Sequence, residues 1–492
     1  MVASTDSLAL TGVPGLDEIL GGGLPRHRIF LLQGDPGVGK TTVGMQFLRE
    51  GAARGEKCLY IALSETASEI KAVVESHAWS LEGIEIVELS AIDQSAGLEA
   101  ENTLFEPSEI ELHETTRMLL AHVERVKPDR VVFDSLSELR LLAQSTLRYR
   151  RQILGLKQYF GDKKTTVLLL DDRTADSHDQ QLQSLAHGVI TLEQHAPTYG
   201  DDRRRLRVAK LRGVKFRGGY HDFAIRTGGA VVFPRLVASA HGSPFPIERV
   251  PSGIEGLDRQ LGGGFDRGTA MLLLGPAGSG KSSIAIHYAV AAASRGERAA
   301  LYLFDERVAT MYLRMQALGI DLAAHVERGD ITIQQIDPAE MGAGEFAAIV
   351  RESVETGTRL VVIDSLNGYL QAMPEEKQLT VQMHELLAYL ANKGVSTFLV
   401  LAQHGLIGQM QSQLDLSYLA DTVVLLRYFE AFGRIRKAIS VLKKRSGLHE
   451  NTISELTLDG SGIHVGAALE HFRGVLTGVP QFDGDVAELA GT

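Results

Sequence analysis

The sequence predicts an α/β protein with two tandem domains, each a mostly parallel, twisted sheet flanked by helices. The first observation is a long internal repeat, in which a segment near the N-terminus recurs after the middle of the chain. The second is that short apolar runs rich in branched residues alternate, in each copy, with segments of helical periodicity. This alternation is typical of buried parallel strands joined by crossover helices.

The repeat sets the expected domain boundaries. The segment TGVPGLDEILGGGLPRHRIFLLQGDPGVGKTT (11–42) is matched by PSGIEGLDRQLGGGFDRGTAMLLLGPAGSGKSS (251–283), and later motifs keep the same order. Between the copies, ASAHGSPFPIE contains two prolines and little periodicity, as linkers do. We therefore expect an N-terminal domain, a linker, a C-terminal domain and a short acidic tail at residues 1–237, 238–248, 249–473 and 474–492.

The elements of the first copy follow from its periodicity. IFLLQG (29–34) predicts a buried strand, and the segment from Thr41 to Arg54 predicts a helix that Gly55 ends. Further strands are predicted at 58–63, 131–135 and 165–170. Because ligands of open α/β sheets bind at the carboxyl ends of the strands, we expect the chemistry at that edge.

Composition excludes several classes of protein. The 492 residues carry 50 Lys and Arg against 61 Asp and Glu, a formal net charge of −11, which disfavours a nucleic-acid coat. Cys58 is the single cysteine, so an intrachain disulfide and a multi-cysteine metal site are excluded, as suits a reducing cytosol. The N-terminus lacks the apolar core of a signal peptide and no apolar run could span a bilayer, so we expect a cytoplasmic protein with no membrane contact.

Two glycine-rich loops fit the pattern G-x-x-x-x-G-K-[ST] of a P-loop, each between an apolar strand and a helix. Their backbone N–H groups and the helix N-terminus favour bound phosphates, Lys40 and Lys281 add a positive charge at the reacting phosphate, and Thr41 and Ser282 offer a hydroxyl to Mg²⁺. We therefore predict ATP and Mg²⁺ as cofactors. The predicted nucleotide-binding residues are Gly34, Asp35, Pro36, Gly37, Val38, Gly39, Lys40, Thr41 and Thr42, and Gly275, Pro276, Ala277, Gly278, Ser279, Gly280, Lys281, Ser282 and Ser283.

An aspartate ends a later apolar strand in each copy. Asp134 follows Val131-Val132-Phe133, and Asp364 follows Val361-Val362-Ile363. Beside a P-loop, such a carboxylate orients magnesium-bound water, so we predict both as metal-site residues. The alternative is that each aspartate caps the helix that follows it.

Acidic residues also follow the strand after each P-loop helix. Glu65 in YIALSET and Asp305-Glu306 in YLFDER are the predicted catalytic carboxylates, because phosphate transfer needs a group that orients or deprotonates the attacking oxygen. The P-loop lysines Lys40 and Lys281 complete the catalytic set. The alternative is that these acids are only solvated strand-end residues.

In the order of its motifs the chain resembles the KaiC family of circadian clock ATPases and autokinases. The resemblance rests on the tandem cores, the GLDxxLGGG segment, the paired P-loops, the acids after the second strand and a late K-x-R segment, and it spans residues 8–475. It implies two RecA-like P-loop domains, a homohexameric double ring and ATP bound between neighbouring subunits. It also implies contacts to the neighbour's nucleotide by Lys210, Leu211, Arg212, Lys443, Lys444 and Arg445; the alternative is that these basic residues are merely solvated.

The family phosphorylates itself on adjacent Ser and Thr residues shortly before a strand that begins Asp-Thr. Here LDLSYLADTVVLL, aligned on Asp421-Thr422, places Ser417 at the Ser position and Tyr418 at the Thr position. The resemblance thus implies serine/threonine autokinase activity with Ser417, and less directly Tyr418, as phosphorylation sites. By itself, a serine at a strand entrance is most often a turn or cap residue.

Two departures from the family bear on function and partners. The family has two adjacent glutamates in each half, whereas this chain has Ser64-Glu65 and Asp305-Glu306, so we expect weak N-terminal hydrolysis. The tail after Val475 is short and acidic and does not predict binding of KaiA, whereas the resemblance leaves KaiB open as a partner of the N-terminal tier.

We therefore expect a KaiC-like ATPase and autokinase that acts as a clock-type or signalling hexamer. One alternative is an ATP-dependent ring scaffold with little or no phosphotransfer. The other is a RecA-like DNA-dependent ATPase, which the acidic composition disfavours.

Overall fold

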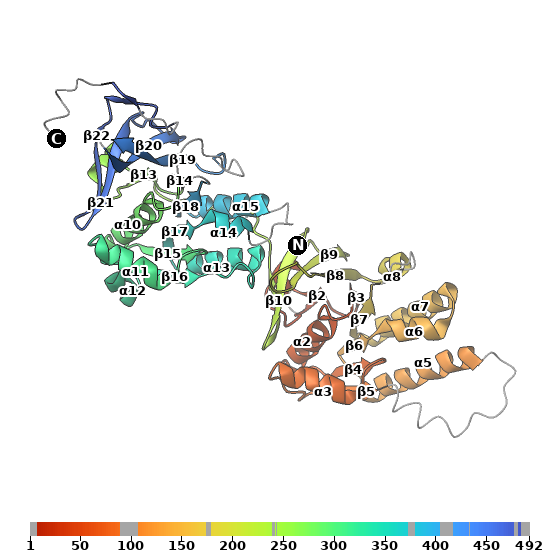
Figure 1. Ribbon diagram of the computed structural model, residues 1–492. Coiled ribbons are helices and arrows are strands. Elements are labelled where there is room, and N and C mark those ends of the chain that lie inside the picture. Colours follow the sequence, from red (N-terminus) through yellow and green to blue (C-terminus); the bar gives the residue numbers. More distant parts are fainter. Residues whose placement is uncertain are drawn as a thin grey trace. The chain divides into compact units, whose positions relative to one another are not determined.

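The computed structural model (Figure 1) describes residues 7–88, 107–173, 179–238, 242, 244–371, 379–403, 417–431, 433–476 and 481–483. The chain divides into two compact units, Met1–Arg235 and Leu236–Thr492. Each unit is an α/β layer structure in its own right and is described by itself. None of the described helices is both long enough and apolar enough to cross a bilayer.

In the described part of the N-terminal unit, one sheet has the strand order β11-β10-β9-β8-β3-β7-β6-β4-β5. The strands from β8 to β5 are parallel and β9, β10 and β11 are antiparallel. Their bounds are β3 (Ile29–Gly34), β4 (Cys58–Ala62), β5 (Ile84–Glu88), β6 (Arg130–Asp134), β7 (Thr166–Asp172), β8 (Gly188–His195), β9 (Arg203–Leu211), β10 (His221–Arg226) and β11 (Gly229–Phe233). β1 (Leu8–Ala9) and β2 (Leu24–Pro25) form a separate pair.

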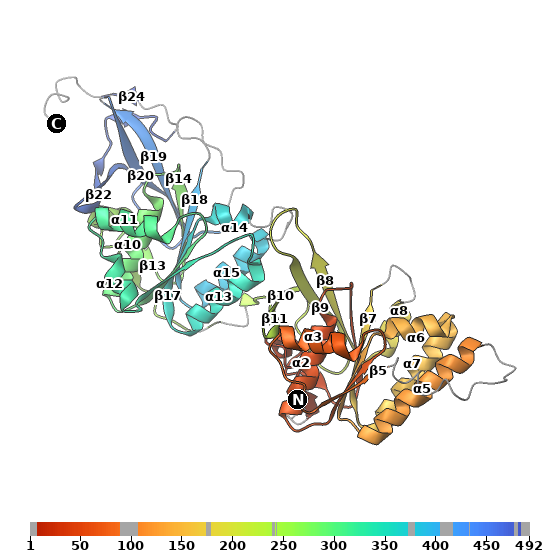
Figure 2. The ribbon, with the colours of Figure 1, turned by 60° about the horizontal axis from the view of Figure 1, so that its bottom comes forward.

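Helices cover both faces of this sheet (Figure 2). The short α1 (Leu16–Ile19), α2 (Lys40–Ala53) and α3 (Ala67–Ser76) pack on one face, and α5 (Pro107–Val126), α6 (Leu136–Ala143), α7 (Thr146–Lys163) and α8 (Asp179–Leu185) pack on the other. Because both faces are covered, every residue of β3 is buried, which explains its continuous apolar run. Thr66 and Glu69 form a reciprocal capping box that starts α3.

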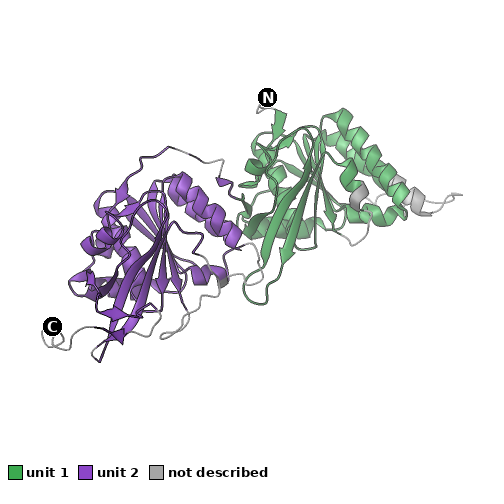
Figure 3. Ribbon diagram, turned by 90° about the horizontal axis from the view of Figure 1, so that it is seen from above, with its two compact units in different colours: residues 1–235 green, residues 236–492 purple. Residues whose placement is uncertain are grey.

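The C-terminal unit, purple in Figure 3, repeats this architecture in the order β16-β15-β17-β18-β14-β19-β20-β21-β22. The strand bounds are β14 (Ala270–Gly275), β15 (Arg298–Leu303), β16 (Ile331–Gln335), β17 (Thr358–Asp364), β18 (Ser396–Ala402), β19 (Thr422–Ala431), β20 (Arg434–Lys444), β21 (Ile453–Asp459) and β22 (Gly462–Ala468). The short pairs are β12 (Arg249–Val250) with β13 (Phe265–Asp266), and β23 (Phe472–Arg473) with β24 (Gln481–Phe482).

The helices of this unit again form two layers. α9 (Glu255–Gln260), α10 (Lys281–Ser294), α11 (Val308–Ala317) and α12 (Leu322–Glu327) cover one face, and α13 (Ala343–Glu355), α14 (Leu366–Gln371) and α15 (Leu379–Asn392) cover the other. The predicted fold class, two mostly parallel sheets flanked by helices, is therefore confirmed. In the N-terminal sheet β6 and β7 lie between β3 and β4, so the strand that precedes Glu65 is not adjacent to the P-loop strand.

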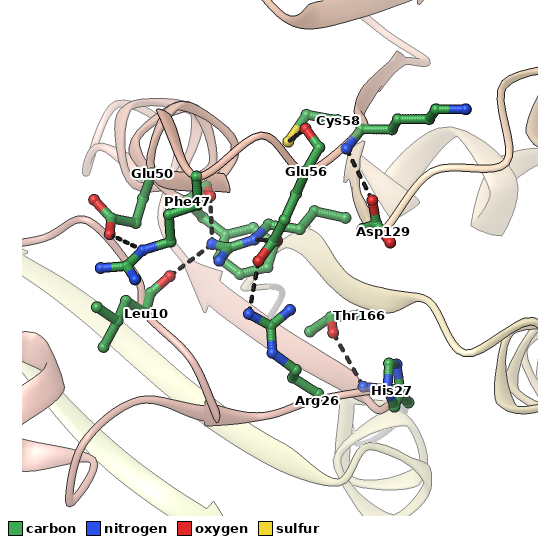
Figure 4. Close-up of polar contacts among 12 residues, drawn as sticks. Leu10, Arg26, His27, Phe47, Glu50, Glu56, Cys58, Asp129 and Thr166 are labelled. Atoms are coloured by element: carbon green, nitrogen blue, oxygen red, sulfur yellow. Dashed lines mark hydrogen bonds and ion pairs between the residues drawn. The ribbon is translucent and has the colours of Figure 1, made fainter. Parts of the chain in front are cut away.

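The fully buried Arg130 joins three segments of the N-terminal unit, and its partners Leu10, Phe47 and Glu56 are labelled in Figure 4. Arg130, on β6, donates to the backbone oxygens of Leu10 at 2.6 Å and Phe47 at 2.8 Å, and its Nε lies 2.5 Å from the Glu56 carboxylate. Gly51 on α2 makes room for it, since a Cβ there would lie 2.6 Å from the Arg130 side chain. The buried cation thus depends on a glycine in the facing helix.

Candidate functional site

The N-terminal P-loop links the buried end of β3 to the first turn of α2. Gly37 and Gly39 have φ values of 81° and 106°, a region that side chains with a Cβ rarely adopt, so the loop conformation depends on glycine. Lys40 curls over the loop and donates to the backbone oxygens of Gly34 at 3.0 Å and Asp35 at 2.9 Å. Residues 34–42 therefore form one continuous cradle at the N-terminus of a 14-residue helix, an arrangement that suits a bound anion.

Asp134 faces this cradle from the end of β6. The Thr41 hydroxyl donates to Asp134 Oδ2 at 2.7 Å, and the buried Tyr60 hydroxyl donates to the same oxygen. The N-cap residue of the following helix is Ser135, and no side-chain cap bond is formed there. The Asp134 carboxylate is therefore directed at the P-loop hydroxyl and does not cap a helix.

Glu65 lies beyond β4 and is electrostatically coupled to the same group of residues. Burial raises the pKa of its carboxyl, the charges of Asp134 and Glu69 raise it further, and Lys40 lowers it. Its Oε2 is buried and has no hydrogen-bond partner among the described residues. A half-buried carboxylate with a raised pKa and an open acceptor oxygen is suited to accept a proton.

The C-terminal P-loop repeats the cradle, with Gly278 and Gly280 at φ 74° and 108°. Lys281 donates to the backbone oxygen of Pro276 at 2.6 Å. Burial lowers the pKa of Lys281 to about 8, an effect that the charge of Asp364 opposes. Residues 275–283 therefore surround the Lys281 ammonium, whose charge is only weakly offset by the charge of Asp364.

The acids of the C-terminal site have different partners from those of the N-terminal site. Burial raises the pKa of Asp364, and a hydrogen bond from Ser282 lowers it. Burial also raises the pKa of Glu306, against the lowering effect of Arg314, whose Nη2 lies 2.8 Å from its carboxylate. Asp305 instead accepts a hydrogen bond from the Ser365 hydroxyl. Of the adjacent acids Asp305 and Glu306, Glu306 is therefore the acid that the Arg314 guanidinium holds at the site.

Besides Tyr60 and Ser365, three further residues of these sites were not predicted from the sequence. Tyr428 on β19 donates to the Ala277 oxygen of the P-loop at 3.2 Å, and Arg314 on α11 holds Glu306. Asp172, at the end of β7, lies 2.7 Å from Lys40 Nζ. The position of Asp172 at the carboxyl end of a predicted strand was a usable signal, whereas the other two contacts depend on tertiary approach alone.

In each sheet the late basic segment lies at the amino ends of the parallel strands, and the P-loop lies at their carboxyl ends. Lys210 on β9 pairs with Val189 at the amino end of β8, whereas the P-loop follows the carboxyl end of β3. Lys210 donates to the backbone oxygens of Gln183 at 2.7 Å and Ala186 at 2.8 Å, and Arg212 donates to Ser184. These cations are therefore placed away from the P-loop of their own unit.

The C-terminal segment has the same placement and includes one residue that points inward. Lys443 donates to the backbone oxygen of Ser417 at 2.8 Å, and Arg445 donates to that of Tyr418 at 3.1 Å. Lys444 differs, because its side chain is 1% exposed and its Nζ lies 3.1 Å from Asp266 in the interior of its own unit. Its ammonium is therefore not directed toward a nucleotide outside the unit, and the side chain of Leu211 is buried in the same way.

The two phosphorylation candidates lie in the turn before β19. Tyr418 is exposed and Ser417 is half-buried, and both precede the amino end of the strand. Since the P-loop lies at the carboxyl end of the neighbouring strand β14, this turn and the P-loop of the same unit are at opposite edges of the sheet.

Comparison with known proteins agrees with this duplicated site. The family model described as "ATPase: KaiC" matches residues 9–237 and 250–470. The chain is 24% identical to the circadian clock protein KaiC3 of Synechocystis sp. over 98% of this chain and 96% of the relative, and 28% identical to KaiC2 of the same organism over 98% and 86%. It is 26% identical to the circadian clock oscillator protein KaiC of Parathermosynechococcus lividus over 96% and 87%. With its two RecA-like units and paired P-loops, the chain belongs to the KaiC family of ATPases.

Proposed function

We propose that both units bind and hydrolyse Mg·ATP and that each site is completed by a neighbouring subunit of a homohexameric double ring. The observation that carries this is the repeated set of a P-loop lysine, a P-loop hydroxyl and a strand-end aspartate facing that hydroxyl. In each unit the late cations lie at the sheet edge opposite the P-loop. Such cations can serve a nucleotide only across an interface between subunits.

The residues present fit a magnesium ion. Thr41 with Asp134 and Ser282 with Asp364 provide hydroxyl and carboxylate oxygens, the ligands that Mg²⁺ prefers. In the part of the chain that the structure describes, Asp364 Oδ2 is buried without a hydrogen-bond partner. Bound Mg²⁺ would neutralise phosphate charge during transfer. Lys40 and Lys281 bind the phosphates, and Glu65 and Glu306 orient the attacking water and accept its proton.

The test is the number of nucleotides bound per chain. Lys40→Ala and Lys281→Ala should each remove one of two bound ATP molecules and leave the other, because each lysine serves one cradle. Equilibrium dialysis with labelled ATP measures this. Loss of both nucleotides from either variant, in a chain that remains folded, would contradict two independent sites.

A specific contact favours autophosphorylation at Ser417 as a second activity. Lys443 and Arg445, the cations proposed to reach the neighbour's nucleotide, hold the backbone of Ser417 and Tyr418. If these cations reach a neighbouring ATP, the Ser417 hydroxyl is carried toward the same γ-phosphate. Transfer would break the bond between the β,γ-bridging oxygen and the γ-phosphorus, release ADP and form a bond to Ser417 Oγ. The Ser417 proton would pass to a base of the subunit that holds the ATP, such as its Glu306.

Labelling with γ-labelled ATP distinguishes the alternatives. Wild type and Tyr418→Phe should incorporate label and Ser417→Ala should not. Absence of label in all three, with ATP-dependent assembly intact, would favour a ring scaffold without phosphotransfer. ATP turnover that rises with single-stranded DNA would favour the DNA-dependent ATPase instead.

We place this activity in the cytoplasm, in a clock-type or signalling assembly. Cys58 is buried, and burial raises the pKa of its thiol to about 12, so the single cysteine has no evident redox role. A KaiB-like protein is the proposed partner of the N-terminal unit, by analogy with the family alone.

A further inference from the structure

The P-loop lysine of the N-terminal unit already has an anionic partner. Lys40 Nζ lies 2.7 Å from Asp172 Oδ1, and the Lys40 side chain is 7% exposed. The Ser137 hydroxyl on α6 donates to the other carboxylate oxygen, Oδ2, at 3.1 Å. Asp172 pairs in register with Gly34, the first residue of the P-loop, so the carboxylate is anchored directly beside the cradle.

The C-terminal unit has no carboxylate at this position. Gly275 pairs in register with Ala402, and Asn367 replaces Ser137 and closes on the Ala402 backbone with bonds of 2.7 Å and 3.1 Å. Within the described residues, no carboxylate lies at ion-pair distance from Lys281, and its pKa is lowered to about 8. The two P-loop lysines therefore differ: among the described residues, Lys40 has a carboxylate partner in its own unit and Lys281 has none at ion-pair distance.

We infer that Asp172 sets the nucleotide affinity of the N-terminal site by competing with the phosphates of ATP for Lys40. The inference rests on the proposed function, in which Lys40 binds those phosphates. For ATP to bind, the buried ammonium must exchange the half-buried Asp172 carboxylate for a phosphate, so the gain in charge neutralisation is small. Asp172, still held by Ser137, then faces the phosphates as a like charge, which weakens binding further.

The experiment confines binding to one unit at a time in the full-length chain. In a Lys281→Ala background, which leaves the N-terminal site, Asp172→Asn should tighten Mg·ATP binding about tenfold, because close charge pairs couple by about that amount. Asn can still accept the Ser137 hydrogen bond, so the loop remains supported. Asp162→Asn, at an exposed position on α7, makes the same change in net charge and should leave the affinity unchanged.

The reciprocal arm transfers the carboxylate to the other unit. In a Lys40→Ala background, Ala402→Asp combined with Asn367→Ser copies the N-terminal pair and should weaken ATP binding at the C-terminal site by a similar factor. Equilibrium dialysis with labelled ATP measures each affinity, and a thermal melt confirms that each variant is folded. This arm tests the same competition if Asp172→Asn does not fold.

Each outcome decides between the inference and the function on which it rests. Unchanged or weaker ATP binding in Asp172→Asn, with ATP still bound by the Lys281→Ala background, would overturn the role of Asp172 and leave the proposed function standing. A folded Lys281→Ala chain that binds no ATP would instead overturn the proposed N-terminal site.

Discussion

At the scale of single residues, the buried Lys281 couples nucleotide binding to pH. Its pKa is lowered to about 8 in the free site, while the phosphates of ATP stabilise the charged ammonium. Binding above pH 8 must therefore take up a proton. In a Lys40→Ala background we expect the affinity at pH 9 to be about tenfold lower than at pH 7, because each pH unit above the free-state pKa costs one factor of ten.

Calorimetry in two buffers of different ionisation enthalpy measures this proton uptake directly. The matched control is the Lys281→Ala chain, whose remaining site has Lys40 paired with Asp172. If the Lys40→Ala chain takes up no proton on binding ATP at pH 9, the low pKa of Lys281 is wrong.

Arg314 offers a second prediction at this scale. Burial raises the pKa of Glu306, and the neighbouring guanidinium lowers it, so removing that cation should raise the pKa of the carboxyl again. Arg314→Met should therefore move the acidic limb of the C-terminal ATPase pH profile upward, by about one pH unit. The control is Arg351→Met, which removes an arginine that pairs with Glu355 on α13 and should leave the profile unchanged. If Arg314→Met does not shift the profile either, Glu306 is not the titrating base.

Much of the site could be predicted residue by residue. The P-loops and the two strand-end aspartates are contiguous patterns whose chemistry depends on local spacing, and the structure brings each P-loop hydroxyl to its aspartate. Asp172 had a usable signal in its place at the end of a predicted strand, but its contact with Lys40 joins segments distant in sequence. The contacts of Arg314 and Tyr428 depend on tertiary approach, so no local pattern marks them.

At the scale of elements, the two units have different residues at the same contact between the P-loop helix and the sheet. Arg130 on β6 lies against Gly51 on α2, whereas Leu360 on β17 and Ala292 on α10 occupy the equivalent positions. Gly51→Ala should destabilise the N-terminal unit by about 1–3 kcal/mol through overpacking. Arg130→Leu alone should cost about 3–5 kcal/mol, because it leaves Glu56 and two backbone oxygens without this donor.

The double variant Gly51→Ala/Arg130→Leu copies the C-terminal pair and should recover part of that loss, since Ala fills the space left by the guanidinium and Glu56 keeps Arg26. Denaturant unfolding of the three variants measures the coupling. Strictly additive losses would mean that helix and strand do not adapt to each other at this contact.

The strands and helices themselves were predictable from periodicity. The order of the strands, in which β6 and β7 lie between β3 and β4, was not predictable, because strand pairing over long separations leaves no local signal.

At the scale of the whole molecule, the decisive feature is that a P-loop and the late cations of one unit lie at opposite edges of its sheet. Arg445, 53% exposed and 3.7 Å from Asp421, is at the amino end of β19, far along the sheet from Lys281. A head-to-tail ring would bring the Arg445 edge of one subunit to the Lys281 edge of the next. Turnover at the C-terminal site should then require residues from two chains.

Mixed rings test this directly. In a Glu65→Gln background that silences N-terminal hydrolysis, Lys281→Ala and Arg445→Ala chains should each be inactive alone. Co-expressed in equal amounts, they should recover about a quarter of the parental turnover, because random order in a ring places an intact Lys281 opposite an intact Arg445 at that fraction of interfaces. Arg445→Ala mixed with the double variant Lys281→Ala/Arg445→Ala provides the control and should stay inactive. Recovery that does not exceed this control would mean that Arg445 does not act on the nucleotide of a neighbouring subunit, and the shared site would have to be abandoned.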